Sequence, residues 1–136
     1  MNPRRGRVSS GARGALGFAL LLAGCGPGGD SASGIVLDWQ LRPDPPAVGT
    51  AVFSFTLTDT TEGGGPVQGA GIRVEGNMSH AGMKPVLADA REEAPGRYRA
   101  DLELTMGGDW FLLIDAELPD GRTLSRQVDV PGVRSR

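Results

Sequence analysis

The chain has 136 residues, which is enough for one domain of ordinary size and too few for two large ones. Its 39% hydrophobic and 22% charged residues are typical of a globular protein, whereas 5% aromatic residues are too few for a surface that stacks on nucleic acid. One Cys and one His exclude a disulfide framework and a zinc finger, and the 10 basic against 16 acidic residues from position 25 onward argue against phosphate-backbone binding.

The first 24 residues have the layout of a secretory signal. Basic residues precede an apolar run at 15–23, which is too short to span a bilayer, since a spanning helix needs about 20 residues. The run ends in Leu22-Ala23-Gly24-Cys25, which resembles the bacterial lipoprotein box. This predicts cleavage before Cys25 and its lipidation, hence an extracytoplasmic protein anchored to the cell membrane or the outer membrane. The alternative is a plain signal peptide that leaves Cys25 as a free thiol.

Residues 25–34 are rich in Gly and Ser and contain no large apolar side chain. We expect them to form a flexible tether between the lipid and a folded domain.

From residue 35 the pattern of apolar and polar residues has a period of two, which is typical of strands. Segments separated by turns rich in Gly and Pro show it at 35–41, 51–57, 70–78, 86–90, 98–104, 110–118 and 124–130. No helical pattern lies between them, and 110–118 is apolar enough to be a central strand. We therefore expect an all-β domain at 35–131, an immunoglobulin-like antiparallel β-sandwich of about seven strands, followed by a tail at 132–136.

The bulky part of the predicted core has to come from aromatic side chains, because no disulfide is available. The expected contributors are Trp39, Phe53, Phe55, Tyr98 and Trp110.

Catalytic patterns are weak. Ser79 and His80 are neighbours, and neighbours on a strand point to opposite faces, so they do not make a nucleophile and its base. The adjacent pair Glu92 and Glu93 is more typical of a solvated turn than of a glycosidase. We expect neither an enzyme nor a small-molecule substrate.

Soft metal ligands are concentrated in one part of the sequence. Met78, His80 and Met83 lie within six residues, and on an extended segment Met78 and His80 project to the same face. Met106 continues the inward phase of the strand at 98–104 and is expected at the same end of the sandwich. Thioethers and imidazole suit Cu(I) rather than Mg²⁺ or Ca²⁺. The pattern predicts a Cu(I) site, and the alternative is that the methionines fill the core and the His is merely hydrogen-bonded.

Several short motifs in the order of the chain resemble the YtkA-like and FixH-like family of bacterial exported or membrane-anchored β-sandwich domains. They are Pro45–Gly49, Gly65–Ala70, Met78–Pro85, Pro95–Tyr98 and Met106–Trp110. The resemblance extends over residues 35–131. It implies a link to copper handling and to assembly of respiratory oxidases, as in FixH-like members, although those carry a transmembrane helix. YtkA-like members are often small lipoproteins.

With this resemblance, the expected function is a lipid-anchored Cu(I) carrier or assembly factor that uses Met78, His80, Met83 and Met106. Its expected partner is a copper-accepting or oxidase-assembly protein, and Trp110 is expected to flank the site. The competing hypothesis is an immunoglobulin-like module that binds another envelope protein through a sheet edge, without metal. That module would bury its methionines and keep them apart.

Overall fold

A computed structural model of the protein describes residues 31–136, so the predicted signal peptide and Cys25 lie outside the described residues. Within this range the chain is all-β, and no helix is long and apolar enough to cross a membrane. The strands are β1 (Ile35–Arg42), β2 (Gly49–Asp59), β3 (Gly65–Pro66), β4 (Gly71–Met78), β5 (Val86–Ala94), β6 (Arg97–Leu104), β7 (Gly108–Glu117) and β8 (Thr123–Val133). The seven predicted strands are confirmed, and the two-residue β3 is an addition.

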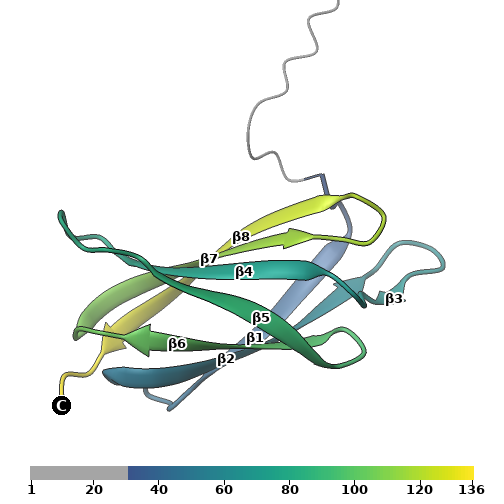
Figure 1. Cartoon of the computed structure of the whole chain (residues 1–136). Helices are drawn as coiled ribbons and strands as arrows, with labels where there is room; N and C mark the ends of the chain where they lie inside the picture. Colours follow the sequence, from purple (N-terminus) through teal and green to yellow (C-terminus); the bar gives the residue numbers. More distant parts are fainter. Residues whose placement is uncertain (1–30) are drawn as a thin grey trace, which may run out of the picture.

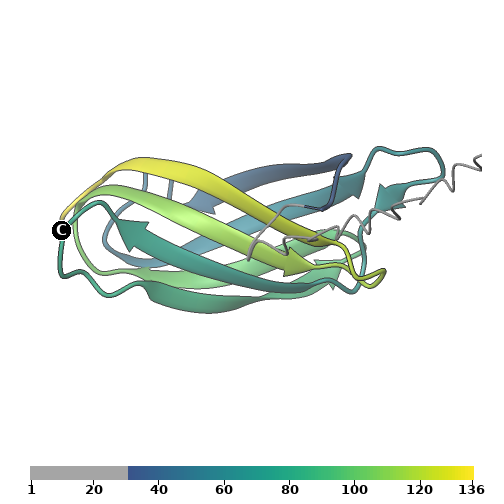
Figure 2. The same ribbon diagram turned by 90° about the horizontal axis from the view of Figure 1, so that it is seen from above.

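The strands form an antiparallel sheet in the order β1-β2-β6-β5-β4-β7-β8, with β3 added to β2. The sheet curls so that β1, β2 and β6 face β4, β7 and β8 across the core, and all strands run along the length of an elongated molecule (Figures 1 and 2). These neighbours correspond to the two sheets of a constant-type immunoglobulin domain. The predicted β-sandwich is confirmed, and β7 is the central strand of its layer, as its apolar sequence indicates.

Strand β5 connects the two layers. Its first half, Val86–Ala90, pairs with β4, and after the change of partner Arg91–Ala94 pairs with β6. An irregularity between Glu92 and Ala94 bends the strand at that point. The two layers are therefore one continuous sheet at this side of the molecule.

On the other side of the sandwich, backbone hydrogen bonds between described residues join the two layers near both ends. At one end the Arg134 carbonyl accepts a hydrogen bond from the Val48 N–H over 2.9 Å, beside an isolated bridge between Ala47 and Arg134. At the opposite end the Ser31 N–H donates to the Thr123 carbonyl over 3.0 Å. We call the first end the tip and the second the base, and residue 31 therefore enters the domain at the base.

The tip consists of the loops and turns at residues 43–48, 79–85 and 105–107 and the segment 134–136. The base consists of the turns at 60–64, 95–96 and 118–122 and the entering residues 31–34. The C-terminus marks the tip in Figure 1, and β3 lies near the base.

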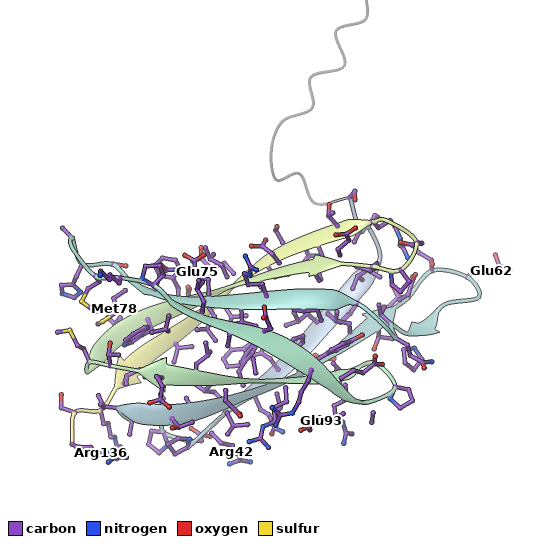
Figure 3. All side chains as sticks on the ribbon, in the orientation of Figure 1. Arg42, Glu62, Glu75, Met78, Glu93 and Arg136 are labelled. Atoms are coloured by element: carbon purple, nitrogen blue, oxygen red, sulfur yellow. The ribbon has the colours of Figure 1, made fainter. Side chains whose placement is uncertain are left out.

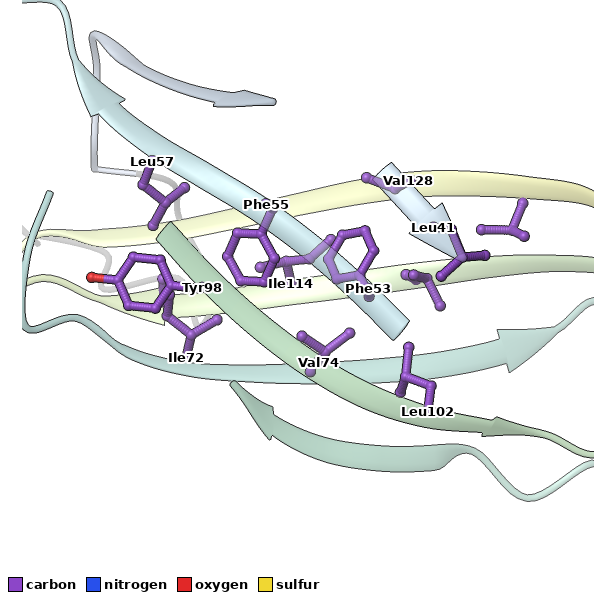
Figure 4. Packing of buried hydrophobic residues seen from close by; sticks show 14 of the residues in the cluster. Leu41, Phe53, Phe55, Leu57, Ile72, Val74, Tyr98, Leu102, Ile114 and Val128 are labelled. Carbon is purple, nitrogen blue, oxygen red and sulfur yellow. The ribbon is translucent and has the colours of Figure 1, made fainter. Parts of the chain in front are cut away.

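The core runs between the layers and contains most of the expected aromatic residues. Phe53, Phe55 and Tyr98 are at most 2% exposed, and their rings follow one another along the core (Figure 4). The expectation that Trp39 fills the core is wrong, because its side chain is 44% exposed. Trp39 has the inward phase of β1, but β1 is an edge strand, and the indole borders an open groove between β1 and β8 that Val130 also lines.

Tyr98 fixes the segment that carries the chain from one layer to the other. Its hydroxyl donates to the Val67 carbonyl over 2.6 Å and accepts from the Ala70 N–H over 3.2 Å. Burial raises the pKa of the Tyr98 hydroxyl, which stays neutral and keeps its proton to donate. The residues between β3 and β4 are thereby held to β6.

An ion pair joins two turns at the base. Arg122 reaches Asp59 at the end of β2 and Asp120 in the β7–β8 turn, at 2.8 Å in each case. The pKa of Asp59 is lowered to about 2 because its carboxylate accepts hydrogen bonds from the Thr61 hydroxyl, from Arg122 and from the Thr61 N–H. Charged hydrogen bonds thus join the two turns at the base.

Candidate metal centre

All four predicted ligands lie at the tip. Met78 ends β4, His80 and Met83 lie in the β4–β5 turn, and Met106 lies in the β6–β7 turn. These two turns are neighbours, because β4 pairs with β7 up to the pair Met78 and Trp110. In Figure 3 the yellow sulfur atoms gather at the end of the molecule where Met78 is labelled. The expected gathering of these residues at one end is therefore what the structure has.

Met78 is the buried methionine of the tip. Its side chain is 8% exposed and belongs to the core cluster. Its methyl carbon packs against the backbone of Gly108, where an added Cβ would lie 3.0 Å from Met78 Cε. Gly108 also has a φ of +127°, which L side chains rarely adopt. Gly108 therefore leaves room for the thioether of Met78 beneath the β6–β7 turn.

The β4–β5 turn, which follows Met78, carries His80 and Met83. Gly82 has a φ of +84°, and the Met83 N–H donates weakly to the His80 carbonyl over 3.5 Å, so the chain reverses here. His80 is exposed, while Met83 is half-buried against the core. The expectation that Met78 and His80 share one face is wrong, because β4 ends at Met78 and its alternation stops there.

The side chain of Met106 also does not point where the strand pattern predicted, because its strand ends before it. Its side chain is 50% exposed instead of facing inward, because β6 ends at Leu104 and the inward phase does not continue into the turn. Trp110 lies beneath Met106, is 3% exposed, and donates its indole N–H to the Met106 carbonyl over 2.9 Å. The indole is thus part of the core directly under the turn that bears Met106.

The chemistry of the tip is that of soft donors. Within residues 31–136 there is no group of three or more His, Cys, Asp or Glu side chains able to hold a metal ion. The tip offers instead three thioethers and one imidazole, from exposed, half-buried and buried positions. Such donors bind Cu(I) well and are poor ligands for Mg²⁺ and Ca²⁺.

One structural requirement of the tip is not visible in the periodicity. Gly107 lies against the C-terminal segment, where an added Cβ would be 2.3 Å from the Ser135 hydroxyl oxygen, and Gly108 lies against Met78. The sequence signal for this packing is the Gly107-Gly108 pair at the start of the apolar strand β7. A Gly-Gly pair is typical of a simple turn, and the sequence alone does not show that other residues pack against the backbone on both of its sides.

The fold and the tip define a class of protein: an immunoglobulin-like β-sandwich that carries methionine and histidine side chains on the turns at one end. A family model described as YtkA-like matches residues 36–115, and the chain belongs to this family. This confirms the YtkA-like part of the resemblance, while its FixH-like part stays a prediction. No curated protein and no solved structure matches the chain.

Proposed function

We propose that the tip binds Cu(I) and that the protein is a copper carrier or assembly factor outside the cytoplasm. One observation carries this proposal. The single His of the chain and every methionine among the described residues lie at the same end of the domain. They occupy the end of β4, the β4–β5 turn that follows it, and the adjacent β6–β7 turn. Core packing alone does not account for this, since Met106 is half-exposed and His80 is exposed.

The graded exposure of these side chains suits transfer of the ion rather than permanent storage. Met78 and Met83 lie against the core, while His80 and Met106 are accessible from solvent. A partner's ligand approaches Cu(I) from the open side and binds before the last donor of this protein is released. Only ligand exchange takes place, so no electron or group is transferred.

The proposed anchor fits this arrangement. If Cys25 is lipidated, the chain leaves the membrane and enters the domain at the base, where Ser31 is bonded to Thr123. The strands separate base from tip, and β2, with 11 residues, has a length of about 36 Å. The methionines therefore face away from the anchor, toward a copper-accepting or oxidase-assembly protein.

A competitive Cu(I) titration against a chromophoric chelator tests the proposal. We expect the wild type to take one Cu(I) from the chelator and the variant His80→Ala/Met83→Leu to lose most of this affinity, since Leu keeps the volume of Met without its sulfur. The matched control is Arg97→Ala, which changes an exposed residue at the base. Equal affinity of the wild type and the double variant would contradict the proposal.

A second candidate is supported by the edge strand β1. Val36 and Trp39 are each 44% exposed there, which favours an interaction module that binds another envelope protein through this edge. In that case Trp39→Ala abolishes partner binding, and Cu(I) titrations of the wild type show no competition with the chelator.

A further inference from the structure

The indole of Trp110 is buried beneath the tip, beside Gly76 of β4. Trp110 lies on β7 directly opposite Met78 on β4. Its ring lies close to Gly76, where an added Cβ would be 3.6 Å from Trp110 Cε3 and 2.7 Å from Val86 Cγ2. At 3% exposure, the ring has little freedom to move.

This rigid ring holds a segment outside the strand ladders. β6 ends at Leu104 and β7 begins at Gly108, so the intervening turn lies beyond the two strands. The Trp110 Nε1–H donates to the Met106 carbonyl over 2.9 Å, in a partly buried position where water competes poorly. The backbone of Met106 is thereby tied to the core, although its side chain is half-exposed.

We propose that Trp110 is a positioning residue for Met106. Through its N–H it fixes the backbone from which the Met106 thioether extends, in the turn that precedes Gly108, the residue that contacts Met78. The consequence for Cu(I) affinity rests on the proposed function, while the positioning itself does not. A donor held in place before binding loses less conformational freedom when the ion binds.

The metal-free protein gives the first test. In the wild type the indole N–H of Trp110 exchanges slowly with solvent, whereas that of the 44%-exposed Trp39 exchanges fast and serves as an internal control. In Trp110→Phe, which keeps a ring and removes the donor, NMR of methyl-labelled methionine shows a more mobile Met106 methyl, and Trp39→Phe leaves it unchanged. Fast exchange of both indoles, or a Met106 methyl unaffected by Trp110→Phe, overturns the positioning role.

A double-mutant cycle with Cu(I) separates positioning from general destabilisation. Trp110→Phe weakens Cu(I) binding by up to about tenfold, because the freed Met106 backbone must then be ordered when the ion binds, at a cost no greater than the lost hydrogen bond had supplied. It has little further effect in the Met106→Leu background, because the side chain that it positions no longer binds. Equal weakening in both backgrounds overturns the positioning role. Absence of Cu(I) binding to the wild type refutes the proposed function alone, since the NMR test does not involve copper.

Discussion

The hydroxyl of Tyr98 holds the connection between the two layers, and its removal has a predictable effect on stability. Tyr98→Phe keeps the ring, which stacks beside Phe55 with ring centroids 5.6 Å apart, and deletes only the oxygen. Two hydrogen bonds are lost, and the Val67 carbonyl and the Ala70 N–H lose their shared partner. Each such bond contributes about 0.5–1.5 kcal/mol, so the free energy of unfolding falls by about 2 kcal/mol.

Urea unfolding at 25 °C, followed by circular dichroism, measures this change. We expect a lower midpoint with an unchanged slope, because the variant buries the same surface. The matched control is Ser125→Ala, which also deletes a hydroxyl that donates a hydrogen bond, here to Asp115 on an exposed face. Its effect should stay within about 0.5 kcal/mol. If Tyr98→Phe costs no more than this control, our reasoning about the 67–70 connection is refuted.

Two further changes test the tip and the base. Gly108→Ala should destabilise the fold by about 1–3 kcal/mol in urea unfolding and should move the NMR resonance of the Met78 methyl group. The control is Gly82→Ala, which is also at positive φ but has no atom within 4 Å of its added Cβ. It should leave the Met78 resonance in place. Asp59→Asn should lower stability at neutral pH. Because the folded pKa of Asp59 is about 2 against an ordinary 3.8, its contribution is complete above pH 3.8 and is lost as the pH falls toward 2, so unfolding curves of the two proteins should converge there. A stability difference that is the same at pH 2 and pH 7 would contradict the assigned role of this carboxylate.

The strands were predictable because half-buried strands alternate with a period of two, and this pattern is local. The partners of β5 were not predictable, since Val86–Ala90 and Arg91–Ala94 belong to one strand but pair with different layers, and a local pattern does not specify which strand lies beside it. The exposure of Trp39 was missed for a related reason. Its phase points inward, but whether anything covers it depends on the distance between β1 and β8, which no local pattern encodes.

The candidate site was predictable in its location and not in its geometry. Antiparallel connectivity brings the turns after β4 and β6 to one end, so the gathering of Met78, Met83 and Met106 follows from counting strands. Their exposure depends on where each strand stops. β6 ends at Leu104, two residues before Met106. The alternation of inward and outward side chains therefore does not continue to Met106, as we had expected.

The tip and the base differ in what holds them together. At the base, Arg122 joins two turns through charged hydrogen bonds. At the tip, the contacts are apolar or involve the backbone, as in the indole N–H bond to Met106.

X-ray absorption spectroscopy of the protein loaded with one equivalent of Cu(I) tests the central claim most directly, because it identifies the ligand atoms. We predict sulfur neighbours from thioethers together with an imidazole nitrogen, and a smaller sulfur contribution in Met106→Leu. A spectrum with only nitrogen and oxygen neighbours, or one that the Met106→Leu change leaves unaltered, would contradict the assignment of the tip as a Cu(I) site.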